Sequence, residues 1–331
     1  MRRAARETGR ALDALAEMGI SFTLVDVGAS LEPFPAFRPL LGHATYVGFD
    51  PDLREMQTEA HAAGRRVVID KALVAERAQS TAHFFLTRNP TCSSTLRPLS
   101  AAVAPYLHAY RFEVVGEAEV ASTTVGEALA SASLDRVDWL KLDSQGTDLR
   151  LFESLDDSLV ATLMAVDAEP GFEPYYAGED VFGDLHRTMV GSGFWMSDLT
   201  YERAVRLRRS TFEGELRGSA DRQRTALEFT LKTSPIAAAP RYLRTLASLD
   251  ERGAGRDDYL RLWACAHVSG NHPYALDVIV ECRERHGTDA GVGELVALSV
   301  RRNRRDAWRH SYRLAGKLNA RNLKRLVSKT Y

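Results

Sequence analysis

The chain has few cysteines, little net charge and no long apolar run, and each shortage excludes a class of protein. Its 331 residues include only three cysteines, Cys92, Cys265 and Cys282, in no metal-ligand spacing, so we expect reduced thiols and predict no metal site. No apolar stretch reaches the roughly 20 residues of a membrane-spanning helix, and charges interrupt the N-terminal residues too often for a signal peptide. We therefore expect a cytoplasmic protein with no transmembrane segment.

The formal net charge of -1 conceals a cationic C-terminal tail. From Arg301 onward the chain has eleven lysines and arginines and one acid, Asp306. This pattern is typical of a solvated helix face, or of an anchor for an anionic surface or a protein partner. Nucleic acid is not favoured as a substrate, because the sequence contains no base-flipping motif of the Asn/Asp-Pro-Pro-Tyr/Phe type.

Length and patterning predict two structural units. A chain of this size exceeds one ordinary core of roughly 100 to 200 residues. The composition changes around residues 234–240, and beyond it no strand-like alternation remains. We therefore expect an N-terminal helix at 1–20, an α/β domain at 21–234 and a small all-α region with the basic tail at 240–331.

The α/β domain is predicted from apolar strands separated by helical stretches. Residues 22–27, 45–49 and 66–69 read as buried strands, and helices between them would make the strands parallel. Further strands are expected at 82–86, 111–115, 137–142, 161–166 and 194–199, and helices at 124–132, 148–159 and 181–189. The pattern loosens between residues 81 and 120, and this region, which includes the turn-rich residues 88–98, looks like an insertion near the site. The fold class is a doubly wound, mostly parallel α/β sheet of about seven strands.

Ligands of such sheets bind beyond the carboxyl ends of the strands, so the residues that follow each strand are the first candidates. Asp26 and Gly28 end the first strand, where glycine permits a tight turn near a ligand. Asp50 ends the second strand, about 20 residues later, where a ribose-binding carboxylate belongs. Asp50 could equally cap a following helix that begins at Pro51. Together the two strand ends favour a ligand that contains adenosine, without separating S-adenosylmethionine (SAM) from NAD.

Residues 138–148, DWLKLDSQGTD, resemble the pattern Asp-Phe-Leu-Lys-Ile-Asp-x-Gln/Glu-Gly-x-Glu/Asp of the FkbM family of methyltransferases. Other segments agree in order. These are the VDVGAS turn, the GFDPD acid, Lys71-Ala72-Leu73, Ser93-Ser94, and the stretches 165–176 and 182–199. The resemblance covers roughly residues 20–230. An NAD-dependent oxidoreductase would need a Gly-x-Gly-x-x-Gly turn, which does not follow Gly28.

The resemblance implies a class I, Rossmann-like methyltransferase fold that binds S-adenosyl-L-methionine and methylates a hydroxyl of a carbohydrate or secondary metabolite. By the match, Gly28 and Ser30 line the methionine end of SAM, Asp26 orients that loop and Asp50 holds the ribose. Asp143 would face the methyl donor, with Lys141 as its partner. The alternative is that Lys141 and Asp143 form a structural ion pair between strands.

Glu169 follows the strand expected at 161–166 and is our first choice for the substrate contact or general base. Desolvation at that position would raise the pKa of its carboxyl toward a useful value. Other candidate proton-handling or binding groups are His83, His186, Tyr175 and Tyr176. Ser93 and Ser94 could close a loop over the pocket or cap a turn.

Glu32 departs from the family pattern, which has glycine at this place in the turn. A carboxylate beside the methionine carboxylate of SAM would repel it. Glu32 either points to solvent, or weakens SAM binding, or marks a chain that has lost catalysis. Pro33 and Pro35 could also shift the start of the next helix. An alternative function is thus a non-catalytic, methyltransferase-like scaffold that recruits a partner through its C-terminal helices.

Overall fold

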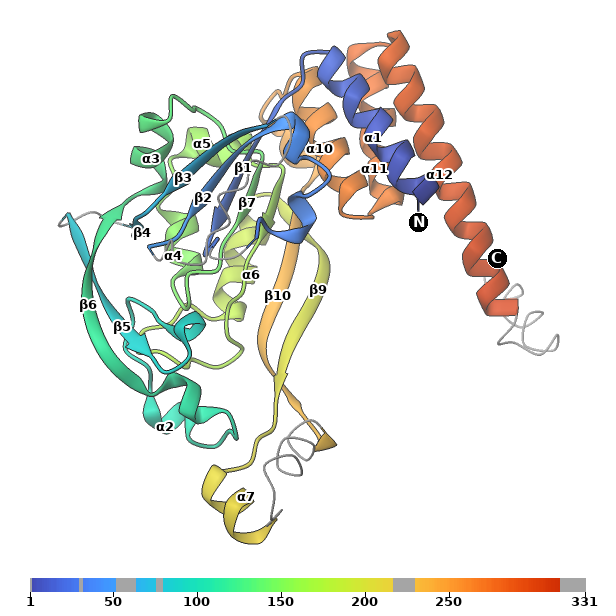
Figure 1. Ribbon diagram of the computed structural model, residues 1–331. Helices are drawn as coiled ribbons and strands as arrows, with labels where there is room; N and C mark the ends of the chain where they lie inside the picture. Colours follow the sequence, from blue (N-terminus) through green and yellow to red (C-terminus); the bar gives the residue numbers. More distant parts are fainter. Residues whose placement is uncertain (1, 30–31, 52–63, 76–79, 217–229, 316–331) are drawn as a thin grey trace. The chain divides into compact units, whose positions relative to one another are not determined.

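A computed structural model describes the chain except for residues 1, 30–31, 52–63, 76–79, 217–229 and 316–331 (Figure 1). The chain forms two compact units. One combines Met1–Ile20 with Ala254–Tyr331, and the other, the α/β unit, is Ser21–Gly253. The predicted N-terminal helix is present as α1 (Arg2–Glu17), and it belongs to the same unit as the C-terminal helices.

The α/β unit is built on a seven-stranded, mostly parallel sheet, which confirms the expected α/β class (Figure 1). Its strands lie in the order β3-β2-β1-β7-β8-β10-β9. Their bounds are β1 (Phe22–Val27), β2 (Ala44–Phe49), β3 (Arg65–Ile69), β7 (Trp139–Lys141), β8 (Ala165–Asp167), β9 (Phe194–Ala204) and β10 (Ser234–Arg244). The five strands from β3 to β8 are parallel, and β10 runs antiparallel to both β8 and β9. The order reverses between β1 and β7, and the carboxyl ends of the strands at such a point are where ligands of doubly wound sheets bind.

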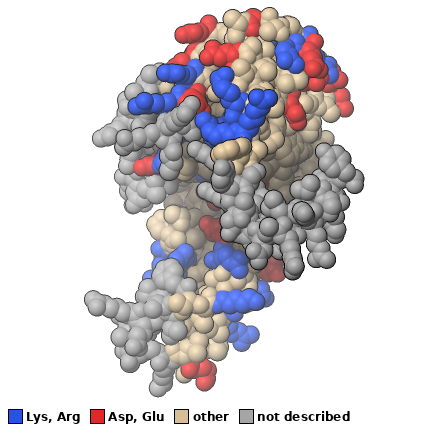
Figure 2. All heavy atoms as spheres, turned by 90° about the vertical axis from the view of Figure 1, so that its right-hand side faces the viewer, with Lys and Arg blue, Asp and Glu red and all other residues tan. Residues whose placement is uncertain are grey.

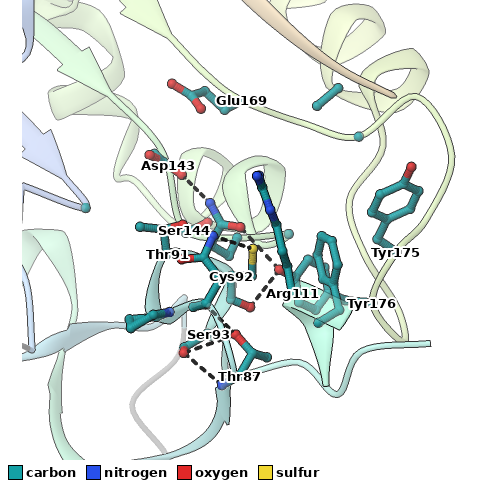
Figure 3. A pocket seen from close by; sticks show the side chains of 18 of the residues that line it. Thr87, Thr91, Cys92, Ser93, Arg111, Asp143, Ser144, Glu169, Tyr175 and Tyr176 are labelled. Atoms are coloured by element: carbon teal, nitrogen blue, oxygen red, sulfur yellow. Dashed lines mark hydrogen bonds between the residues drawn. The ribbon is translucent and has the colours of Figure 1, made fainter. Parts of the chain in front are cut away.

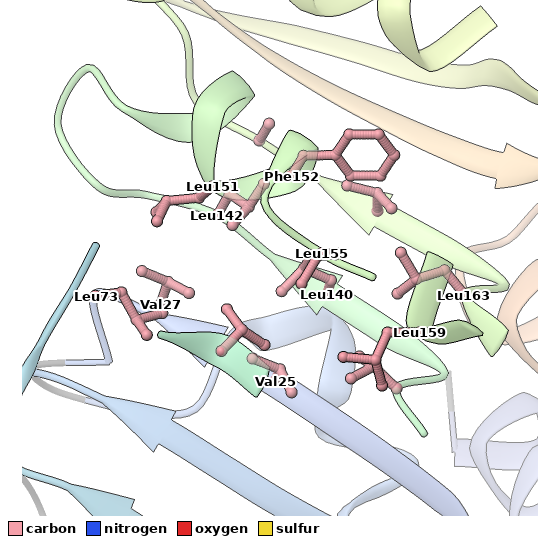
Figure 4. Close-up of a cluster of buried hydrophobic side chains, with 14 of the residues drawn as sticks. Val25, Val27, Leu73, Leu140, Leu142, Leu151, Phe152, Leu155, Leu159 and Leu163 are labelled. Atoms are coloured by element: carbon pink, nitrogen blue, oxygen red, sulfur yellow. The ribbon is translucent and has the colours of Figure 1, made fainter. Parts of the chain in front are cut away.

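One face of this sheet carries the hydrophobic core (Figure 4). Alternate residues of neighbouring strands, such as Val25, Leu140 and Val166, are fully buried there. They pack against helices α3 (Val125–Ser131), α4 (Asp148–Glu153), α5 (Asp157–Thr162) and α6 (Phe182–Gly191). The period of two along each strand and the apolar helix faces thus produce this core cluster.

A second, three-stranded sheet forms the predicted insertion. Its order is β4-β6-β5, with strands β4 (Ala72–Leu73), β5 (Thr81–Thr87) and β6 (Val114–Thr123). Between β5 and β6 lie η4 (Pro90–Cys92), α2 (Ser100–Val103) and η5 (Ala109–Phe112). The strands expected at 82–86 and 111–115 are therefore present, the second starting three residues later than expected.

Several expected boundaries are wrong. The predicted domain boundary at 234–240 lies inside β10, and the α/β unit continues through α9 (Leu246–Glu251) to Gly253. The single helix expected at 148–159 is two helices, α4 and α5. The strand expected at 161–166 is shorter and is limited to β8. Between β1 and β2 the described residues form short 3-10 helices, η1 (Pro35–Phe37) and η2 (Leu41–His43), and no α-helix. Helix α7 (Arg209–Glu215) follows β9, which is longer than predicted.

The other unit is helical, as expected for the C-terminal region. It contains α1, α10 (Arg256–Val268), α11 (His272–His286) and α12 (Ala290–Ala315). Trp263 is fully buried and donates to the Ser299 hydroxyl at 2.9 Å, which links α10 to α12. No described helix is long and apolar enough to cross a membrane.

The start of the basic tail is partly neutralised within this unit. Arg302 pairs with Asp306 at 3.1 Å, and Arg305 pairs with Glu7 of α1 at 2.7 Å. Figure 2 shows basic and acidic side chains next to one another on the face that it displays. The remainder of the predicted tail, residues 316–331, lies outside the described residues.

Candidate functional site

A cavity of about 1340 Å³ lies at the carboxyl ends of the central strands (Figure 3). Four predicted site residues line it: Gly28 after β1, Asp50 after β2, Asp143 after β7 and Glu169 after β8. Parallel strands at a topological switch point bring their ends together, so residues far apart in sequence meet here.

Gly28 is required by both backbone conformation and space. Its φ is +74°, and a Cβ at this position would lie 2.6 Å from the Asp143 carbonyl oxygen. Its amide donates to the Phe49 carbonyl at 3.0 Å, which fixes the turn against the end of β2. The turn therefore brings its backbone to the cavity wall in a way that no other residue permits. Ser30, the other predicted residue of this turn, lies outside the described residues.

Asp26 lies beneath the cavity and holds the turn in place. Its side chain is 1% exposed, and it accepts hydrogen bonds from the Phe34 amide at 2.8 Å and the Tyr46 hydroxyl at 3.0 Å. Burial raises the pKa of the Asp26 carboxyl, and Lys141 lowers it in part. Asp26 does not line the large cavity, so its position fits the predicted loop-orienting role and not a direct ligand contact.

Lys141 joins β1 to β7. Its ammonium donates to the Val27 carbonyl at 2.8 Å and lies 3.2 Å from Asp143 and 3.7 Å from Asp26. Burial lowers the pKa of Lys141, but the Asp143, Asp26 and Glu169 carboxylates raise it more, so the side chain stays charged. Lys141 lines a second, smaller cavity of about 230 Å³ and not the large one. The structural ion pair considered from the sequence is thus present, and Lys141 lies behind the site.

Asp143 is held between two donors at the cavity wall. Lys141 contacts one carboxylate oxygen, and the Gln145 amide donates to the other at 2.7 Å. Gln145 has a φ of +57°, and its backbone carbonyl accepts from Ser94 at 2.7 Å. Ser94 is fully buried and fastens the insertion to the end of β7, whereas Ser93 accepts from the Thr87 amide and closes a turn within the insertion.

Glu169 is positioned by Asp148, a buried residue that the sequence did not single out. One Asp148 oxygen accepts from the Glu169 amide at 2.8 Å, and the other accepts from the Ser144 hydroxyl at 2.5 Å. Burial raises the pKa of the Glu169 carboxyl to about 8, with a further increase from Asp143 and a decrease from Lys141. A carboxyl with this pKa exchanges its proton near neutral pH, which suits a general base.

The alternative residues separate into two groups. Tyr175 and Tyr176 line the cavity, and the Tyr176 hydroxyl donates to the Cys92 carbonyl at 2.8 Å. His83 and His186 are not among the lining residues. His83 of β5 pairs with Glu119 of the neighbouring strand β6. His186 stacks on Phe182 and contacts the Tyr242 hydroxyl. The two histidines are therefore excluded as groups of this site.

Glu32 does not face the cavity. Its side chain is 51% exposed and forms an ion pair with Arg38. Pro35 begins the 3-10 helix η1, so the described residues after β1 include no α-helix whose N-terminus could support a ligand. Of the three alternatives considered for Glu32, the structure agrees with the first, in which the side chain points to solvent.

The insertion contributes lining residues that the sequence did not indicate, among them Cys92, His108 and Arg111. Among the residues that the structure describes, no group of three or more His, Cys, Asp or Glu side chains could hold a metal ion. No family model, curated protein or solved structure matches this chain.

Proposed function

We propose that this chain is a SAM-dependent methyltransferase that transfers a methyl group to a hydroxyl oxygen of a carbohydrate or secondary metabolite. One observation carries the proposal. Gly28, Asp50, Asp143 and Glu169 were selected from the sequence alone, and all four line a single cavity at the strand ends.

The strand order supports a methyltransferase over a dehydrogenase. A dinucleotide-binding Rossmann sheet has six parallel strands in the order 3-2-1-4-5-6. Here β10 enters antiparallel between β8 and β9, which is the arrangement expected of the class I methyltransferase fold that the sequence resemblance implies. The absence of a Gly-x-Gly-x-x-Gly turn agrees with this interpretation.

The lining residues suit SAM. Asp50 is buried at the end of β2, where its carboxylate would accept from ribose hydroxyls. Gly28 would let the backbone approach the methionine portion, and the outward direction of Glu32 leaves no carboxylate of the turn's described residues beside it. SAM supplies a methyl group already activated on its sulfonium, so the chain has to align the acceptor oxygen and remove its proton.

Glu169 is the residue that would remove that proton. It lines the cavity beside Asp143, and its raised pKa makes it a stronger base than an exposed glutamate. The hydrogen bond from its amide to Asp148 fixes the backbone from which the carboxylate extends. Lys141, buried and charged behind Asp143, would hold the Asp143 side chain in place.

Calorimetry with S-adenosylhomocysteine (SAH) tests the proposal. We expect the full chain to bind SAH, and Asp50→Ala to lose at least about tenfold in affinity, because ribose hydrogen bonds to a charged group contribute about 1.5–3 kcal/mol. Glu32→Gln is the matched control and should leave the affinity unchanged. A folded protein that does not bind SAH at millimolar concentration would contradict the proposal and favour the scaffold alternative.

A further inference from the structure

One end of the cavity is an aromatic wall, which we define as His108, Phe112 and Tyr175. The ring centroids of Phe112 and Tyr175 are 5.4 Å apart, those of His108 and Phe112 5.8 Å, and those of His108 and Tyr175 6.3 Å. His108 and Phe112 come from the insertion, and Tyr175 comes from the loop after β8. All three line the cavity, so they present ring surfaces to whatever occupies it.

The cavity also contains a cation that no described residue neutralises. Its described cationic lining residues are Lys71, Arg111 and Arg203. Arg203 is occupied, because it donates to the Thr233 hydroxyl at 2.7 Å and to Tyr201 at 3.1 Å. Lys71 follows β3, near the Asp50 end. The Arg111 side chain, on η5, has no hydrogen bond or ion pair with any described residue, and Figure 3 shows it extending into the cavity.

A polar atom of the aromatic wall is also without a partner. The Nε2 atom of His108 is buried and makes no hydrogen bond in the described part of the chain. Burial, together with the Arg111 charge, lowers the pKa of His108 to about 4. The imidazole is therefore neutral at neutral pH and packs in the wall as an uncharged ring.

We propose that Arg111 and the aromatic wall form the acceptor subsite, and that the acceptor is a sugar-like ring that carries a carboxylate or phosphate group. This inference rests on the proposed function. The guanidinium binds the anionic group, and the rings of the wall, including the uncharged His108 ring, pack on the sugar ring. A guanidinium matches the planar geometry of carboxylates and phosphates, which explains an unpaired arginine at this position.

The dimensions of the cavity agree with this division. The cavity volume of about 1340 Å³ exceeds the roughly 300–1,000 Å³ of ordinary small-molecule sites, so SAM and a separate acceptor both have room. Glu169 and Asp143 lie at the strand ends, and the subsite lies on the insertion. Two further carboxylates line the cavity: Glu179 accepts from the Tyr175 and Tyr176 amides, and Glu202 of β9 would favour a cationic sugar.

Binding of matched sugars to the full chain, with and without SAH, tests the subsite. The probes are glucuronate, glucose 6-phosphate, glucose and glucosamine, observed by ligand-detected NMR titration. We expect at least one of the two anions to bind in the millimolar range, more tightly than glucose. Arg111→Met should weaken anion binding at least about tenfold, because a charge-assisted hydrogen bond is lost. Arg88→Met is the control, since Arg88 is in the same loop, pairs with Glu113 and does not line the cavity.

The outcomes distinguish the subsite from the cofactor site. SAH binding that survives Arg111→Met, together with lost anion binding, supports the subsite. Binding of neither anion, tighter binding of glucose or glucosamine, or equal anion binding by Arg111→Met would overturn it. If the unaltered chain binds the anions but not SAH, the subsite stands and the proposed function fails.

Discussion

At the scale of single residues, Gly28 combines two constraints that a pair of variants can separate. Gly28 and Gly178 have nearly equal φ angles, +74° and +72°, but a Cβ would meet atoms within 4 Å only at Gly28, the nearest being the Asp143 carbonyl oxygen at 2.6 Å. Gly178→Ala should cost only the left-handed conformation, about 1–2 kcal/mol. Gly28→Ala should cost more and should also abolish SAH binding, because the turn must move. Urea denaturation and calorimetry measure both effects. Equal costs for the two variants would show that the turn yields without displacing the end of β7.

The raised pKa of Glu169 predicts a pH dependence of stability. The folded-state pKa of about 8 lies above the ordinary value of 4.5, so the folded protein keeps a proton that the unfolded chain releases between these values. The resulting stability is fully present below pH 4.5 and is lost as pH rises through about 8. Relative to Glu169→Gln, the unaltered protein should lose up to about 1.4 kcal/mol per pH unit within that window. Denaturation of both proteins across the window measures it.

The same titration predicts the direction of the catalytic pH profile. Glu169 must be deprotonated to accept the hydroxyl proton, so the transfer rate should rise as pH passes about 8 and then level off. A stability difference between the two proteins that does not vary with pH would mean that Glu169 is ionised across the whole window. Glu169 would then be no stronger a base than an exposed glutamate.

The site residues that the sequence revealed are those that directly follow strands. The sequence could predict Gly28, Asp50, Asp143 and Glu169, because a doubly wound sheet brings its strand ends together whatever the details of packing. The sequence could not predict Arg111 and His108, because these residues line the cavity only as a result of how the insertion folds. Asp148 lay within the recognised motif, but its role depends on a hydrogen bond to Glu169, 21 positions away, which no local pattern encodes.

At the scale of elements, β10 shows how a strand can be mistaken for a linker. Its sequence SPIAAAPRYLR has two prolines and a run of alanines, which are typical of a connection. The register with β9 shifts between Pro235 and Ala237, so the first proline falls at an irregularity in the ladder. Pairing with β8 and β9 on both sides stabilises the strand, and those contacts are far apart in sequence.

Arg244, at the end of β10, fastens that strand to two helices. Its guanidinium is 2% exposed and donates to the carbonyls of Leu163 at 2.9 Å and Ser192 at 2.8 Å, just beyond the ends of α5 and α6. It also lies over the Phe194 ring at 3.9 Å. Arg244→Met should destabilise the α/β unit by about 3–5 kcal/mol, because buried carbonyls lose their donor.

Chemical denaturation of the full chain measures this loss. The control is Arg187→Met on α6, whose side chain is 81% exposed and pairs with the exposed Asp184, and which should change stability by less than about 1 kcal/mol. If both variants unfold at the same denaturant concentration, Arg244 does not hold β10 to the helices.

At the scale of the whole molecule, the chain order does not follow the structural units. Helix α1 precedes the sheet in sequence but belongs with α10, α11 and α12. The sequence predicted the N-terminal helix and an all-α C-terminal region. It could not predict which helices pack together, because an apolar helix face indicates that the face is buried but not which element covers it. The unit boundary was missed for the same reason, since it depends on the pairing of β10.

Two fragments with the same start test this boundary. Residues 21–253 contain the whole seven-stranded sheet and α9, whose Leu249 is fully buried. Residues 21–234 lack nearly all of β10, which lies between β8 and β9, so β9 would have no neighbour in the sheet and β8 would expose an edge. We expect the longer fragment to unfold cooperatively and to bind SAH like the full chain. The shorter fragment should aggregate or unfold without a cooperative transition. Cooperative unfolding and SAH binding by residues 21–234 would mean that β10 is dispensable, and would return the boundary to the position that the sequence predicted.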